Sequence, residues 1–62
     1  MTAQEIQRIR HERGLSYRQI AKIVNVNEST IRKAAAGEYT LGGAAERMLE
    51  MLDRGELPER YL

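Results

Sequence analysis

The sequence predicts a small all-α domain of four to five helices. Apolar residues recur three and four positions apart, which is the period of a helix with one buried face. Serine, threonine, asparagine and glycine stand where these segments begin and end. The three aromatic residues are all tyrosines and there is a single proline, a composition that argues against a β-sandwich or barrel.

Length and composition limit what the chain can be. Its 62 residues form one small domain, because a chain of this size buries only about 60% of the surface that it exposes when unfolded. The absence of cysteine excludes a disulfide framework and thiolate metal sites. Apolar residues make up 42% and charged residues 31% of the chain, as in ordinary globular proteins, and no apolar run is long enough to cross a membrane.

A first helix is predicted between Thr2 and Arg13. Thr2 followed three residues later by Glu5 has the spacing of a capping box. Gly14 ends the helix, because glycine accepts the left-handed conformation of a helix end. The residues expected on its buried face are Ile6 and Ile9.

A second helix is predicted over about 16–24. Ser16 and Gln19 repeat the capping-box spacing, and Asn25 ends the helix as the non-glycine residue best suited to a left-handed turn. Ile23 is expected to project away from the core. The residues expected on the buried face are Ile20, Ala21 and Val24.

A third helix is predicted over about 28–36. Asn27 is a favoured N-cap residue, a carboxylate at Glu28 suits the positive end of the helix dipole, and Gly37 ends the helix. The buried face is expected to carry Ile31, Ala34 and Ala35. The outer face is expected to carry Glu28, Ser29, Arg32 and Lys33.

A fourth helix is predicted from near Gly43 to Asp53-Arg54-Gly55. Its apolar face is expected to contain Leu41, Ala44, Ala45, Met48, Leu49 and Leu52. Residues 56–62 then form a tail in which Pro58 is suited to opening one last turn. This tail is expected to dock on the core or on a partner through Leu57, Tyr61 and Leu62.

The second and third helices are joined by a tight turn, and their small interface requires small side chains. Ala21 stands in the middle of one helix, Asn25 provides the reversal, Val26 fills the turn and Ile31 anchors the next helix. This spacing is typical of a helix-turn-helix unit, which holds its second helix where outer side chains enter the DNA major groove. It predicts a DNA-binding domain over residues 1–55.

Residues 15–37 resemble the helix-turn-helix of the Cro/C1-type phage repressors. The matching positions are Leu15, Ser16, Ile20, Ala21, Val24, Val26, Ser29, Thr30, Ile31 and Gly37. The resemblance implies a lambda-repressor-like fold of phage or prophage origin, acting on the nucleoid in the cytoplasm of a bacterial host. Three positions differ from the family pattern: Asn25 replaces Gly, Tyr17 replaces Gln, and Ala35 replaces a Glu that braces the helices.

The resemblance also implies which residues contact DNA. The base contacts would come from Glu28, Ser29, Arg32 and Lys33, and the phosphate contacts from Ser16, Tyr17, Arg18, Asn27, Tyr39 and Thr40. The chemistry agrees, because arginine and lysine donate to guanine and a carboxylate accepts from cytosine N4. Four positions keep an alternative. Arg32 and Lys33 could be ordinary solvated charges on an exposed helix face. Glu28 also suits the helix dipole without any base contact, and the Tyr17 ring could pack on Arg13 or on the helix over 43–53 instead.

Charge is distributed unevenly along the chain. Residues 1–40 carry seven basic and four acidic side chains, a net charge of +3, whereas residues 41–62 carry three basic and five acidic ones, a net charge of −2. A basic first part and an acidic second part favour one face that meets a polyanion.

Three functions are compatible with these features. The first is a sequence-specific, Cro-like repressor, the second is a DNA-binding accessory factor of the excisionase or antitoxin kind, and the third is a protein-interaction module that does not bind DNA. We expect no enzyme, small-molecule substrate or membrane partner, and no cofactor or metal, since His11 has no partner ligand at workable spacing. We expect a weak homodimer, or a monomer that pairs on its palindromic operator, with contacts from the fourth helix and from Leu57, Tyr61 and Leu62. The alternative is that these residues only cover the core of a monomer.

Overall fold

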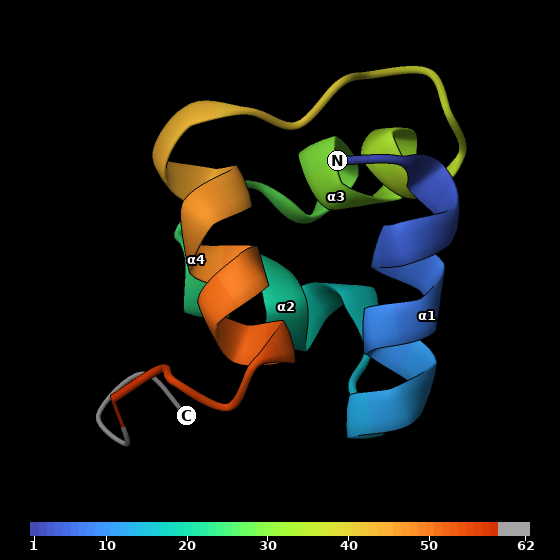
Figure 1. The fold of residues 1–62 in the computed structure, drawn as a ribbon. Helices are drawn as coiled ribbons and strands as arrows, with labels where there is room; N and C mark the ends of the chain where they lie inside the picture. The colour runs from blue at the N-terminus through green and yellow to red at the C-terminus, as the bar shows by residue number, and fades with distance from the viewer. Residues whose placement is uncertain (59–62) are drawn as a thin grey trace.

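The computed structural model describes residues 1–58, and this part of the chain is helical without any β-strand (Figure 1). The helices are α1 (Ala3–Arg13), α2 (Tyr17–Val24), α3 (Glu28–Ala35) and α4 (Gly43–Asp53). The predicted all-α class is therefore confirmed. The predicted last turn from Pro58 extends beyond the described residues, and the predicted docking residues Tyr61 and Leu62 lie outside them. No helix within residues 1–58 combines the length and the apolar character needed to cross a bilayer.

Helix α2 lies at the centre of the arrangement. It packs against α3 and against α4, and α1 packs against α3. The segment over residues 36–42 passes over one end of the molecule to connect α3 with α4 (Figure 1). Each short helix is thus stabilised by its neighbours, as helices of eight residues require.

The ends of α1 and α2 follow the local capping pattern. The backbone N–H of Glu5 donates to the hydroxyl of Thr2 at 3.2 Å. At α2, the N–H of Gln19 donates to the hydroxyl of Ser16 at 3.1 Å, and the N–H of Ser16 donates to the side-chain oxygen of Gln19 at 2.8 Å. Gly14 ends α1 with a φ of 63°. Both predicted helix starts and the predicted end of α1 are confirmed.

The turn between α2 and α3 reverses the chain within residues 25–27. Asn25 has a φ of 60° and is the one non-glycine residue in the described part of the chain with a positive φ. The N–H of Val26 donates to the carbonyl of Ala21 at 3.0 Å, and the Val26 side chain packs against the core. Asparagine therefore does here what the sequence predicts, because it reaches the left-handed region at low cost.

The start of α3 differs from the prediction in one respect. Asn27 occupies the N-cap position in an extended conformation, but its side chain makes no capping hydrogen bond. Helix α3 is therefore held by packing rather than by its cap. It ends at Ala35, one residue before the predicted end, and Gly37 follows with a φ of 81°.

The predicted buried face of the fourth helix is wrong at Ala44, whereas Leu41 is buried as predicted. Leu41 is buried, with 2% of its surface exposed, but it precedes α4 and reaches the core from the loop. Ala44 is exposed. Ala44 lies in the first turn of α4, where no neighbouring segment among residues 1–58 buries it.

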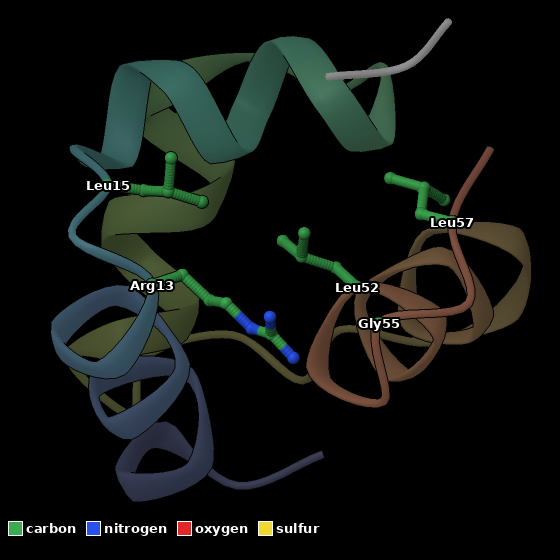
Figure 2. Close-up of a pocket in the computed structure, with 5 residues that line it drawn as sticks. All are labelled: Arg13, Leu15, Leu52, Gly55 and Leu57. Atoms are coloured by element: carbon green, nitrogen blue, oxygen red, sulfur yellow. The ribbon is translucent and has the colours of Figure 1, made fainter. Parts of the chain in front are cut away.

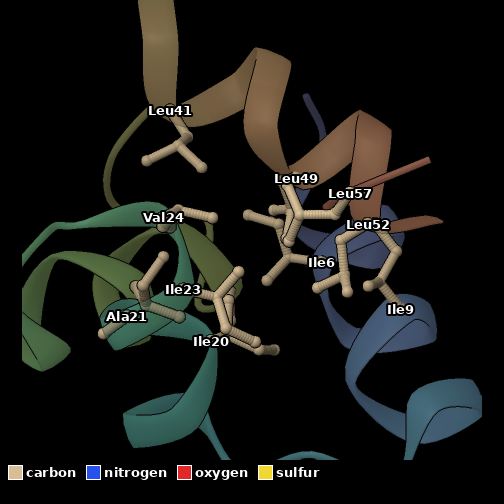
Figure 3. Close-up of a cluster of buried hydrophobic side chains, with 13 residues drawn as sticks. Ile6, Ile9, Ile20, Ala21, Ile23, Val24, Leu41, Leu49, Leu52 and Leu57 are labelled. Atoms are coloured by element: carbon tan, nitrogen blue, oxygen red, sulfur yellow. The ribbon is translucent and has the colours of Figure 1, made fainter. Parts of the chain in front are cut away.

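The core is a single cluster of buried apolar side chains to which all four helices contribute (Figure 3). Ile23 belongs to this cluster with 9% of its surface exposed, so its predicted projection away from the core is wrong. The reason is the central position of α2, which buries a wider arc than a helix packed on one side only. Leu57 joins the cluster from beyond α4, with 8% of its surface exposed. The buried residues are Ile6, Ile9, Ile20, Ala21, Ile23, Val24, Ile31, Ala34, Ala35, Leu41, Leu49, Leu52 and Leu57.

Charged groups join the beginning of the chain to α4. The guanidinium of Arg8 donates two hydrogen bonds of 3.0 Å to the carboxylate of Asp53. The N-terminal amine of Met1 pairs with Glu46, and Arg13 donates to the backbone carbonyl of Asp53. These contacts lie on the α1–α4 side and leave the outer face of α3 free of them.

Candidate nucleic-acid interface

The outer face of α3 is a polar surface on a helix whose other face is fully packed. Ser29, Arg32 and Lys33 are exposed, and Glu28 is half-exposed. The residues of the same helix that face the core are Ile31, Ala34 and Ala35, at 0%, 1% and 5% exposure. The structure therefore places all four predicted base-contacting residues on one helix, and none of them is buried by another segment of residues 1–58.

Small side chains and one long-range hydrogen bond fix the position of α3. Ala34 and Ala35 allow the neighbouring helices to approach closely, and Ile31 is fully buried. The side-chain amide of Gln7, on α1, donates to the backbone carbonyl of Ala35 at 2.6 Å. This bond satisfies a carbonyl at the end of α3 that no intrahelical donor reaches. Helix α3 is thus held at its carboxyl end by α1 and along its length by the core.

Arg32 is held by two contacts. Its Nε donates to the carboxylate of Glu28, one turn earlier, at 2.7 Å. Its guanidinium carbon lies 5.4 Å from the centre of the Tyr17 ring. The Arg32 side chain nevertheless remains 61% exposed. The charge is therefore oriented but accessible.

Tyr17 carries two guanidinium groups on its ring. Besides Arg32, the guanidinium carbon of Arg10 on α1 lies 5.4 Å from the ring centre. The ring is half-buried and packs against the core. Arg13, one of the packing partners that the sequence suggested as an alternative for Tyr17, instead donates to the backbone of Asp53. The ring thus connects α1 to α3 at the start of α2.

The residues predicted to contact phosphate lie at the ends of α2 and α3. Ser16 and Arg18 flank the start of α2, Asn27 precedes α3, and Tyr39 and Thr40 follow it. All five are exposed, and the Tyr39 ring is 51% exposed. Along the sequence, these residues lie before and after α3. Their contact with DNA stays a prediction.

Several cations of this region make no ion pair within residues 1–58. Arg18 and Lys22, one turn apart on α2, are exposed and unpaired in the described part of the chain, and the same is true of Lys33 on α3. No nearby carboxylate offsets the positive potential of an unpaired cation, so the cation attracts an outside anion more strongly. Three of the five acidic partners in the described ion pairs lie on α4 or just after it, and the other two are Glu12 on α1 and Glu28 on α3.

The shifted pKa values belong to the ion pairs between the first part of the chain and α4. Hydrogen bonds from Arg8 hold the pKa of the Asp53 carboxyl below its ordinary value, and the same contact raises the pKa of Arg8. The hydrogen bond to Glu46 raises the pKa of the N-terminal amine. These shifts arise from structural ion pairs.

A small apolar pocket lies away from α3, between the carboxyl ends of α1 and α4 (Figure 2). Its volume is about 200 Å³, and Arg13 contributes the one charged side chain of its lining. The lining residues are Arg13, Leu15, Leu52, Gly55 and Leu57. Within residues 1–58, no group of three or more His, Cys, Asp or Glu side chains is placed to hold a metal ion.

Sequence reasoning missed Arg10 as a member of the interface cluster. Arg10 is half-buried, and its Nε is buried with no hydrogen-bond partner. Its contact with Tyr17 joins two helices, so no spacing within α1 indicates it. The spacing of seven residues between Arg10 and Tyr17 is no known sequence pattern for such a contact.

Comparisons with known proteins leave the interface to be interpreted from its geometry. No protein-family model matches the chain, and neither a curated protein nor a solved structure matches it.

Proposed function

We propose that this protein is a sequence-specific regulator that binds double-stranded DNA and inserts α3 into the major groove. The observation that carries the proposal is the outer face of α3, where Ser29, Arg32 and Lys33 are exposed on a helix anchored by α1 and α2. Arginine and lysine donate to guanine O6 and N7, and serine pairs in either sense. A short helix held rigidly at the surface is the geometry that such readout needs.

The surrounding residues support docking on the DNA backbone. Arg18 and Lys22 are exposed cations on α2, the helix that packs against α3, and Ser16 and Asn27 place polar groups at the starts of α2 and α3. Contacts to phosphate position a protein on the duplex without reading its sequence. Within this class we favour a small Cro-like repressor, which the resemblance of residues 15–37 supports.

We further propose that two copies engage one palindromic operator. A single recognition helix reads few base pairs, and a second copy about one helical turn (about 34–36 Å) away roughly doubles the discrimination. Since Leu57 is buried in the core of its own chain, α4 is the better source of contacts between copies. Sedimentation of the protein alone and with the selected duplex measures the number of copies. One copy per site would contradict dimeric engagement.

Selection of bound duplexes from a randomised library tests the proposed function. We expect a palindromic consensus and a logarithm of the binding constant that falls linearly with the logarithm of salt concentration, by about 0.9 per phosphate contact. Binding that is absent or insensitive to salt would contradict DNA recognition and favour a module that binds protein.

A further inference from the structure

The two contacts of Arg32 leave a particular part of its guanidinium free. The Nε–H is occupied by the carboxylate of Glu28 at 2.7 Å. The four N–H donors on the two terminal nitrogens make no hydrogen bond within residues 1–58. A guanidinium held in this way presents its two terminal nitrogens side by side, and this pair matches the spacing of guanine O6 and N7.

We propose that Glu28 and Tyr17 hold Arg32 as a preset reader of guanine, so that each half-site contains a guanine contacted by Arg32. This inference rests on the proposed function and adds to it the base that is read. It also gives Glu28 a role as a positioning residue instead of a reader of cytosine. The Glu28 carboxylate already accepts the Nε–H of Arg32, and a contact to cytosine would compete with this bond.

The Tyr17 ring acts as the platform beneath Arg32. Its face carries partial negative charge, which attracts the guanidinium. The same ring meets Arg10 at 5.4 Å, so both guanidinium groups lie within about 11 Å of each other. The half-buried ring, packed against the core, fixes the platform relative to α1 and α3. Tyr17 is therefore a positioning residue for Arg32, and this role does not require its hydroxyl.

Holding Arg32 in place favours discrimination because a free arginine side chain loses many rotamers when it binds. A side chain that is oriented before binding loses fewer. The pair Glu28–Arg32 has the i,i+4 spacing with the acid on the N-terminal side, which is the favourable order on a helix. The three residues together give a defined direction to one of the exposed cations on α3.

The test uses the full chain and a duplex recovered by selection, labelled with a fluorophore. Guanines of the half-site are replaced one at a time by 7-deazaguanine, which lacks the N7 acceptor and keeps Watson–Crick pairing. At one position we expect wild-type protein to bind about 2- to 12-fold more weakly, because the replacement removes one of the two acceptors of an arginine–guanine pair and keeps O6. The Arg32→Ala variant should bind both duplexes equally. We call the affinity for the guanine duplex divided by that for the 7-deazaguanine duplex the guanine ratio. Arg54→Ala, which removes the same charge at the end of α4, should keep the wild-type guanine ratio.

Conservative and truncating variants then test the two positioning residues. Glu28→Gln keeps an acceptor for the Arg32 Nε, and Tyr17→Phe keeps the ring, so both should retain the guanine ratio. Glu28→Ala and Tyr17→Ala should each reduce it by about 2- to 5-fold. Neither truncation should reduce it further in the Arg32→Ala background. Thermal unfolding shows whether Tyr17→Ala still folds. If it does not, the comparison of Glu28→Gln with Glu28→Ala still tests the positioning of Arg32.

Different results overturn different claims. If no duplex is selected and no salt-dependent binding is found, the proposed function fails and this inference with it. If the protein binds DNA but no guanine position depends on Arg32, the inference alone fails. It also fails if Glu28→Ala relaxes the preference at a cytosine and leaves the guanine ratio unchanged. Equal loss for Tyr17→Phe and Tyr17→Ala on all duplexes would instead assign the Tyr17 hydroxyl to a phosphate.

Discussion

At the scale of single residues, the two neighbouring cations on α3 differ in how their side chains are held. Arg32 is oriented by Glu28 and Tyr17, whereas Lys33 is exposed with no ion pair in the described part of the chain. Lysine is a flexible point charge, while arginine is a planar fork that gains from being oriented. The two residues therefore suit different contacts, although both lie on the outer face of the same helix.

Removing either cation should weaken specific binding without affecting the fold. Lys33→Ala and Arg32→Ala should each cost about 1–3 kcal/mol of binding free energy if the residue contacts a base. Both side chains are exposed, so the thermal midpoint should stay close to that of the wild type. Fluorescence anisotropy with the selected duplex measures the affinity, and Arg54→Ala serves as the charge-matched control. Wild-type affinity in both α3 variants would show that α3 is not the reader.

At the scale of elements, the short helices depend on caps and on close packing to different degrees. Helix α2 has a complete capping box between Ser16 and Gln19, but the N-cap of α3, Asn27, makes no side-chain bond. The interface between α2 and α3 instead relies on Ala21, which is 3% exposed. The unit is thus stabilised by a cap on one helix and by small side chains between the two.

The caps predict unequal effects of the same kind of substitution. Ser16→Ala should lower the free energy of unfolding by about 0.5–2 kcal/mol, because the N–H of Gln19 loses its acceptor. Asn27→Ala should cost less, because no such bond exists there. Urea unfolding followed by circular dichroism measures both. A larger loss for Asn27→Ala would contradict this account of the caps.

Enlarging the α2–α3 interface should be destabilising. Ala21→Leu adds volume between two packed helices and should cost about 1–3 kcal/mol of stability. The same substitution at the exposed Ala44 of α4 is the control and should change stability little. The thermal midpoint of each variant checks the difference. An unchanged midpoint for Ala21→Leu would mean that the interface can expand without strain.

At the scale of the whole molecule, two sides of the structure differ in their charged groups. The α1–α4 side holds the structural ion pairs, including Arg8–Asp53, and the apolar pocket. The α2–α3 side holds exposed cations that have no acidic partner within residues 1–58, with Arg32 the exception. This separation allows the α2–α3 side to meet a polyanion.

The Arg8–Asp53 pair should make stability fall at low pH. The folded state lowers the pKa of Asp53, so the pair stabilises the protein above the unfolded value of about 4 and loses this contribution as pH falls through the folded value. Thermal midpoints measured from about pH 7 down to about pH 2 should show this loss in the wild type. The loss should be smaller in Asp53→Asn and in Arg8→Gln, and the double variant should resemble either single one. An equally steep acid loss in Asp53→Asn would exclude this pair as a cause.

Features that depend only on neighbours along the chain could be predicted from the sequence. The caps at Thr2 and Ser16 and the reversal at Asn25 require only residues within one turn of a helix. The helical period also predicted the burial of Ile6 and Ile31, because each lies on a single covered face. Local hydrogen bonds and amphipathic spacing are written in short stretches of sequence, so they can be read from it.

The tertiary structure alone decided which surfaces became covered by distant segments. Ile23 is buried because α2 lies between α3 and α4, and Leu41 is buried from a loop that no helical period describes. Tyr17 lies between arginines of α1 and α3, which are far apart along the chain. Such contacts arise only when helices pack, because the packing free energy depends on which faces meet and not on the order of residues within either helix.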